Sequence, residues 1–208
     1  MIGTTETPTP PLVDLMTYID FNPYWTLPPS IAKQEYLPKL QKNAEILDKY
    51  NMKLYYGKKE INPKKINWKK VKEDKFVYTI RQLSGKTNSL GRVKFVFPNN
   101  LHIYLHDTHA RHLFKKKTRA YSHGCIRVQA PLDLAEELLS TIKKWDRKRI
   151  NNVIKSEKHE RIILEHQIPV YLIYLTLYVS PDGELHEYDD IYDRENELIG
   201  RLRKQLKT

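Results

Sequence analysis

The stretch LHIYLHDTHARHLFKKKTRAYSHGCIRVQ, residues 101–129, carries most of the information about fold and function. It contains five of the eight histidines and the single cysteine of the chain. The alternating pattern at residues 101–106 predicts a β-strand, on which His102, Tyr104 and His106 share one face. His106 then stands at the end of this strand, where the chain turns. A side chain in that position is well placed for catalysis.

Outward from this stretch, short runs of β-branched and aromatic residues alternate with turn residues, as in antiparallel sheets. We predict strands over residues 76–82, 94–97, 101–106, 161–164 and 170–179, and helices over residues 31–34, 38–49, 131–145 and 149–156. The run VYLIYLTLYV at 170–179 is apolar on both faces and predicts a central strand. The lysine-rich residues 50–75 predict a peripheral excursion. The predicted fold class is therefore mainly β, of the α+β type, with peripheral helices.

The composition indicates a globular protein with an anionic partner. The 208 residues are enough for one sizeable core, and the formal net charge of +11 favours nucleic acid, an acidic membrane surface or an acidic wall polymer. No apolar run is long enough to predict a transmembrane helix. The segment TTETPTPP at 4–11 predicts an unstructured lead, consistent with a mature product whose export signal has been removed.

The single cysteine, Cys125, permits no internal disulfide and needs another explanation. A lone cysteine is more often a small buried apolar residue than a nucleophile. Gly124 beside it, however, permits close approach of a substrate, and a nearby imidazole would make the thiol an effective nucleophile. His106 and His123 are the candidates for that imidazole.

The residues around Cys125 resemble a known family signature. His106, fifteen intervening residues and then Ser122-His123-Gly124-Cys125-Ile126-Arg127 resemble the motif of the YkuD family of L,D-transpeptidases. Further blocks resemble the YcbB-like branch of that family: NPYW at 22–25, PPSI at 28–31, LGRVKF at 90–95, LHDT at 105–108 and IPVY at 168–171. Two positions depart from the pattern, since Arg127 stands where the general signature often has Asn, and His109 where Pro is expected.

This resemblance implies a set of roles for the motif residues. Cys125 would be the nucleophile and His106 the general base, and the rest of the motif would consist of Ser122, His123, Gly124 and Arg127. Backbone N–H groups from His123 to Cys125 would form the oxyanion hole. Arg127 would either orient a substrate carboxylate or support the loop.

The implied reaction is the cross-linking of peptidoglycan stem peptides. Cys125 would attack the third-residue carbonyl of a tetrapeptide donor, release D-Ala and form a thioester, which the side-chain amine of a second stem would then attack to give a 3→3 cross-link. Carbapenem-type inhibitors would acylate the same thiol. The resemblance implies no cofactor, no metal and no nucleic acid, and a periplasmic or cell-wall location after export.

The resemblance also implies a domain organisation. A catalytic domain over residues 18–195 would have a β-sandwich or barrel core, and residues 37–75 would form a small inserted subdomain that acts as a lid. We expect residues 1–17 to be a flexible lead and residues 196–208 to be a basic tail.

Several alternatives remain open at this point. An L,D-carboxypeptidase or a transpeptidase that attaches a protein to the wall would share the same residues. Outside this class, the histidines and Cys125 could bind zinc, or the basic surface could bind nucleic acid. His102, His109 and His112 are not part of the matched signature, and we expect structural or surface roles for them.

Overall fold

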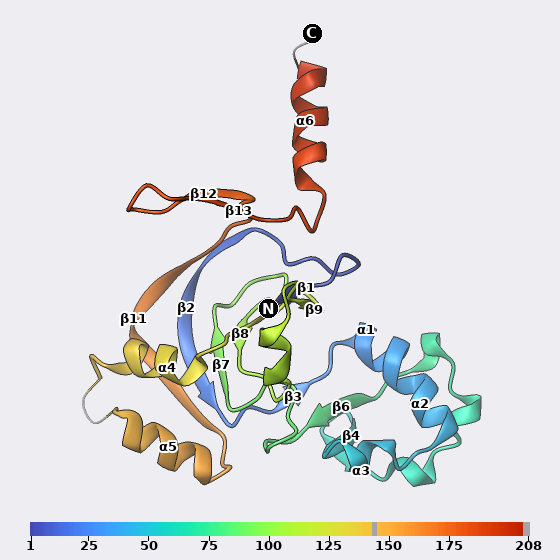
Figure 1. Cartoon of the computed structure of the whole chain (residues 1–208). Helices are drawn as coiled ribbons and strands as arrows, with labels where there is room; N and C mark the ends of the chain where they lie inside the picture. The colour runs from blue at the N-terminus through green and yellow to red at the C-terminus, as the bar shows by residue number, and fades with distance from the viewer. Residues whose placement is uncertain (143–144, 206–208) are drawn as a thin grey trace.

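The computed structural model describes residues 1–142 and 145–205, and its centre is a five-stranded sheet (Figure 1). The strands follow the order β10 (Ile126–Arg127), β8 (Leu105–His106), β7 (Val93–Val96), β2 (Leu12–Phe21) and β11 (Glu160–Leu172). β10 and β8 run parallel, and the other neighbours are antiparallel. The mainly β, α+β fold class is confirmed, but the sheets form no closed barrel in the described part of the chain.

Two helices cover one face of this sheet. They are α4 (Pro131–Leu139), which begins with proline in its first turn, and α5 (Arg147–Lys155), which Asp146 caps by accepting a hydrogen bond from the Arg149 N–H. Their apolar sides bury Leu139 and Ile150 completely. The helix predicted over 131–145 ends at Leu139, and residues 143–144 lie outside the described part of the chain.

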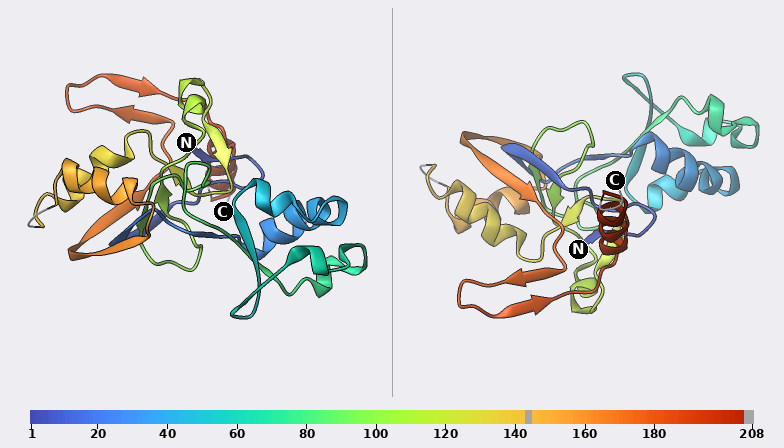
Figure 2. Two further views of the ribbon diagram at one scale, coloured as in Figure 1. Left: turned by 90° about the horizontal axis from the view of Figure 1, so that it is seen from below. Right: turned by 90° about the horizontal axis from the view of Figure 1, so that it is seen from above.

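A second group of strands and helices lies beside the five-stranded sheet (Figures 1 and 2), and it has a hydrophobic core of its own. It is built on a four-stranded sheet in the order β3 (Trp25–Thr26), β6 (Thr79–Gln82), β4 (Met52–Tyr56) and β5 (Lys59–Ile61). Helical segments pack on it: α1 (Pro29–Ile31), the π-helical η1 (Ala32–Tyr36), α2 (Leu37–Lys42) and α3 (Ile46–Lys49), with 3₁₀ turns η2 (Pro63–Lys65), η3 (Trp68–Lys70) and η4 (Glu73–Lys75).

The second core extends beyond the predicted insert of residues 37–75 on both sides. Leu27 and Ile31 before it and Ile80 after it belong to the same buried cluster. The lysine-rich sequence concealed this core because its few apolar residues are spread among many solvated charges. Residues 76–82 were predicted as one strand, but β6 begins only at Thr79.

The first residues of the chain are part of the fold. β1 (Ile2–Gly3) pairs in parallel with β9 (Ala120–Ser122), and β2 already begins at Leu12. The prediction of a flexible lead over residues 1–17 is therefore wrong. Thr and Pro residues suggested disorder, but in the structure the threonines form hydrogen bonds to the chain around Cys125.

The strand predicted over residues 101–106 is reduced to β8, Leu105–His106. The side chain of Asn99 interrupts this strand. Its Nδ2 donates to the carbonyl oxygens of Phe97 and Ile103, and its Oδ1 accepts from Leu101 N and Ile103 N. These bonds replace a strand ladder with a compact loop. His102 in this loop has a left-handed φ of 55°. A 3₁₀ turn, η5 (Arg111–Lys115), follows β8.

The C-terminal part extends away from the body (Figures 1 and 2). It consists of the hairpin β12 (Leu177–Val179) and β13 (Leu185–Glu187), followed by α6 (Arg194–Gln205). The prediction of one central strand at 170–179 is wrong: β11 is an edge strand that ends at Leu172, and Ile173 beyond it is 69% exposed. Most of the tail predicted at 196–208 is helix α6, and residues 206–208 are not described. None of the helices described is long and apolar enough to span a membrane.

Candidate active site

The parallel pairing of β8 and β10 brings the histidine and the cysteine of the signature together. Arg127 lies directly opposite His106 in this pair, and Val128 N donates to His106 O at 2.8 Å. Ile126 N donates to Tyr104 O at 3.1 Å, so Cys125 enters the pair beside Tyr104. Residues 21 positions apart in sequence, such as His106 and Arg127, thus become neighbours across two adjacent strands.

His106 is buried and is held in one tautomer. Its Nδ1 lies 2.5 Å from the carbonyl oxygen of Asp107, which can only accept, so Nδ1 carries the proton. The lone pair of the neutral ring therefore lies on Nε2. Burial, and next the positive charge of Arg127, lower the pKa of His106 to about 3. The imidazole of the free site is therefore neutral at physiological pH, with an unprotonated Nε2.

The carbonyl that holds His106 belongs to a fixed residue. The Asp107 carboxylate is 1% exposed and accepts from Arg92 Nε at 2.9 Å, Arg92 N at 3.0 Å and Arg111 at 2.6 Å. Gly91 passes so close that a Cβ there would lie 2.5 Å from the Asp107 side chain. The LGR block (residues 90–92) and the HDT block (residues 106–108) are therefore in direct contact beside the His106 ring.

The thiol of Cys125 is half-buried and in its neutral form. Burial raises its pKa, while hydrogen bonds from the Tyr104 backbone and side chain and the charges of Lys94 and Arg127 act in the opposite direction. Its Sγ lies 3.7 Å from the carbonyl oxygen of His102, the residue with left-handed φ. Since the imidazole of His106 is neutral as well, the resting pair is thiol and imidazole, not thiolate and imidazolium.

Tyr104 connects the two groups and was not predicted as a site residue. Its hydroxyl hydrogen-bonds to Cys125, and its ring centroid lies 5.7 Å from that of His106. Burial, followed by the negative charge of the Cys125 thiolate form, raises the pKa of Tyr104 well above its usual range, so it remains a donor. The shared strand face of Tyr104 and His106 was the signal in the sequence that could have identified it.

The family comparison agrees with this geometry. The family model described as "L,D-transpeptidase catalytic domain" (YkuD) matches residues 1–153. This chain belongs to the YkuD family. It is 31% identical over 199 residues to a protein of Haemophilus influenzae named "Putative L,D-transpeptidase", and the match covers 95% of this chain and 40% of that protein. The chain thus spans less than half the length of this relative.

The Ser122–Cys125 loop of the YkuD domain is fixed by its own hydrogen bonds. Ser122 Oγ donates to Cys125 O and accepts from Gly124 N at 3.2 Å, and Gly124 has a φ of 101°, which suits glycine. The Gly124 N–H was one candidate for the oxyanion hole, but it is already engaged by Ser122. In the described part of the chain the Cys125 N–H has no such partner and stays available.

A loop near the N-terminus, residues 4–11, supports the same Ser122–Cys125 loop of the YkuD domain. Thr9 Oγ1 donates to Gly124 O at 2.8 Å and accepts from Gly3 N at 2.9 Å. Thr7 Oγ1 donates to Ser122 O at 3.2 Å. The hydroxyl of Tyr192, far along the chain, donates to Gly3 O at 2.8 Å and ties this loop to the C-terminal part.

The side chain of His123 contacts η1, which packs on the second core. Its Nε2 lies 3.0 Å from Glu35 Oε1 in η1, and its side chain is 57% exposed. This contact joins the Ser122–Cys125 loop to η1, which ends just before the predicted lid of residues 37–75. His102 contributes its backbone carbonyl rather than its ring, while His109 and His112 are exposed. Among the residues that the structure describes, no three His, Cys, Asp or Glu side chains converge to hold a metal ion.

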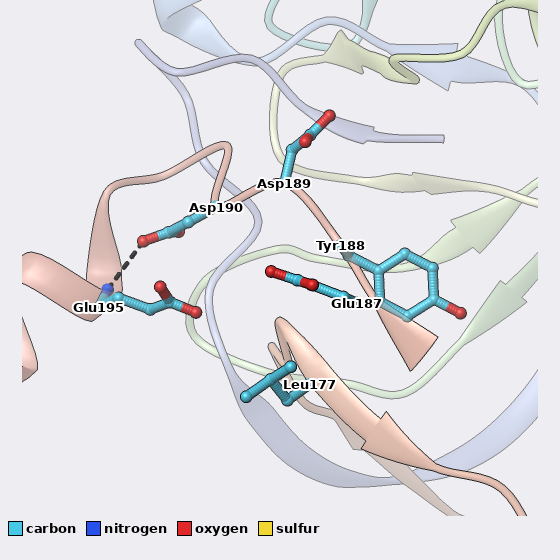
Figure 3. A pocket seen from close by; sticks show the side chains of 6 residues that line it. All are labelled: Leu177, Glu187, Tyr188, Asp189, Asp190 and Glu195. Atoms are coloured by element: carbon cyan, nitrogen blue, oxygen red, sulfur yellow. Dashed lines mark hydrogen bonds between the residues drawn. The ribbon is translucent and has the colours of Figure 1, made fainter. Parts of the chain in front are cut away.

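Two cavities lie apart from Cys125 in this YkuD domain. One of about 430 Å³, between the β12–β13 hairpin and the start of α6, is lined by several carboxylates and has neither cysteine nor histidine (Figure 3). The other, of about 560 Å³, lies behind the site and includes Arg92, Asp107 and Arg111 in its wall. Neither includes the proposed nucleophile.

Proposed function

We propose that this chain is the catalytic domain of a peptidoglycan L,D-transpeptidase that works through a thioester on Cys125. The observation that carries the proposal is the grouping of Cys125, Tyr104 and His106, with the Nδ1 proton of His106 already committed to a backbone carbonyl. This leaves Nε2 as the basic atom of the ring. Such a group suits acyl transfer by a thiol with a general base.

In the first half of the reaction, Cys125 would attack the carbonyl carbon of the third residue of a tetrapeptide stem. The thiol proton moves to Nε2 of His106 as the S–C bond forms. The Cys125 N–H donates to the developing oxyanion, and the hydroxyl of Tyr104 stabilises the charge on sulfur until the bond is made. His106 then gives its proton to the leaving amine, the C–N bond breaks and D-Ala departs, which leaves the thioester.

In the second half, the side-chain amine of a second stem would attack the thioester. His106 accepts a proton from this amine and returns it to the sulfur as the C–S bond breaks. The product is a 3→3 cross-link, and the free thiol is restored. If water attacks in place of the amine, the same residues give an L,D-carboxypeptidase; if a protein amine attacks, they attach that protein to the wall.

The first test is acylation of the thiol by a carbapenem, which we propose as an inhibitor of this site. Intact mass is recorded for the wild type and for Cys125→Ala after incubation with the drug. An adduct of one drug per chain on the wild type alone is expected. A folded wild type that gains no mass would contradict the thioester mechanism.

The second test is product analysis with purified disaccharide tetrapeptide. Cross-linked dimers with release of D-Ala support the transpeptidase, whereas tripeptide alone supports the carboxypeptidase. The proposed substrate places the enzyme in the periplasm or cell wall, and fractionation of cells that produce the full-length protein tests that location.

A further inference from the structure

A row of charged residues crosses the five-stranded sheet and ends at the proposed site. The strand register places Arg161 opposite Asp20, Asp20 opposite Lys94, Lys94 opposite His106 and His106 opposite Arg127. Residues directly opposite in neighbouring strands project from the same face, about 4.8 Å apart. His106 is therefore flanked by a cation on each side.

Neither of these two cations forms an ion pair in the described part of the chain, although buried carboxylates lie nearby. Asp20 is taken by a bidentate pair with Arg161, at 2.7 and 2.9 Å. The carboxylate of Asp107 is taken by two other arginines. The charge of Asp20 still acts on Lys94 from the neighbouring strand, but no carboxylate in the described structure forms an ion pair with Lys94 or Arg127.

Both side chains are partly withdrawn from water. The ammonium of Lys94 lies 3.9 Å from the centroid of the Tyr104 ring, and burial lowers its pKa. Arg127 Nε is buried and has no hydrogen-bond partner. An orphaned buried donor is costly, and half-buried cations without a counter-ion are rare, so a missing anion is the simplest physical account.

We infer that Lys94 and Arg127 bind the α-carboxylate of the amino acid that leaves when the thioester forms. This rests on the proposed function. His106 protonates the leaving amine, and that amine and the α-carboxylate are bonded to the same carbon. When the amine reaches His106, the carboxylate must lie beside His106, where the two cations stand. A guanidinium and an ammonium are the usual partners of a carboxylate.

The arrangement has a consequence for both specificity and catalysis. Lys94 and Arg127 select a donor whose scissile bond links the last residue to the rest of the peptide. Only the last residue has a free α-carboxylate. The bound anion also offsets the positive charges of Arg127 and Lys94, which oppose protonation of His106. The substrate thus brings the charge that lets its own base accept a proton.

The test compares two donors that differ in one group: a tetrapeptide stem with a C-terminal carboxylate and the same stem with a carboxamide. The rate of thioester formation is measured for wild type, Lys94→Met, Lys94→Arg and the surface control Lys65→Met. On the wild type the carboxamide should react about 10- to 100-fold more slowly, the range for a lost charged hydrogen bond.

Lys94→Met should slow the carboxylate donor by a similar factor and barely affect the carboxamide, while Lys94→Arg restores the preference and Lys65→Met leaves it unchanged. Equal rates for the two donors on the wild type would overturn the carboxylate assignment alone, with no variant needed. An equal loss on both donors in Lys94→Met would reduce Lys94 to a structural role and overturn it as well. No thioester from either donor on folded wild type would overturn the proposed function, and this assignment with it.

Discussion

Replacing Asp107 by asparagine should lower the free energy of unfolding without removing a group that takes part in the proposed reaction. The substitution keeps the shape of the side chain and the backbone carbonyl that holds His106, but it removes the negative charge. In the wild type this carboxylate is 1% exposed and accepts three hydrogen bonds, two from Arg92 and one from Arg111. The amide of asparagine would present N–H groups to one of these donors.

The cost follows from these contacts. A hydrogen bond to a charged group contributes about 1.5 to 3 kcal/mol, and Asp107→Asn loses one such bond and weakens the others. The arginine side chains are 36% and 48% exposed, so solvent screens part of the effect. We therefore expect a loss of about 3 kcal/mol in the free energy of unfolding. For a chain of this size that lowers the melting temperature by about 6 to 12 °C.

Urea unfolding followed by circular dichroism measures this loss, and the matched control is Asp133→Asn. Asp133 also pairs with an arginine, Arg147, but its side chain is 70% exposed, so the control should leave the unfolding midpoint almost unchanged. Equal small effects of the two substitutions would refute the reasoning, because burial would then not decide the strength of these pairs.

Further predictions concern the rate of acylation. Because burial and Arg127 lower the pKa of His106 to about 3, its ring stays unprotonated from mildly acidic pH upward, so kcat/KM for thioester formation should be level between about pH 5 and 8. A tenfold fall on acidification through about pH 6.5, the ordinary histidine value, would contradict this. Thr9→Val removes the bond to Gly124 O and should slow acylation about 5- to 10-fold, as a neutral hydrogen bond of about 1 kcal/mol allows; Thr9→Ser should restore the rate. Thr17→Val, which removes a similar bond at Val96 O, is the control, and equal rates in the two valine variants would argue against a role for the loop.

The fold class was predictable because local pattern and final burial agree in most of the catalytic core. The strands around Phe95 and the helix from Pro131 follow the expected periods of two and 3.6. The prediction is wrong at residues 170–179, where the apolar run is not buried on both faces. A run of apolar residues records hydrophobicity, but only the neighbours of the strand decide whether it is covered, and β11 has none on its outer edge.

The site was partly predictable for the same reason. A glycine before a lone cysteine, and a histidine separated by fifteen residues from the Ser-His-Gly-Cys motif, indicate a candidate active site in the sequence itself. Tyr104 shares a strand face with His106 and could have been added from that spacing. Lys94 could not have been added to the predicted site from the sequence. It lies on another strand, and its position opposite His106 depends on the register between β7 and β8.

The sequence by itself determined the family and the mainly β composition, and it marked Cys125 and His106 as the candidate site, since these inferences depend on residue type and short spacing. The tertiary structure alone decided which nitrogen of His106 is free, that the threonines of the first residues support Gly124, and that two cations flank the proposed base without a counter-ion. The physical reason is that hydrogen-bond partners, burial and strand register are properties of residues far apart in the chain. They are fixed only when those residues pack together.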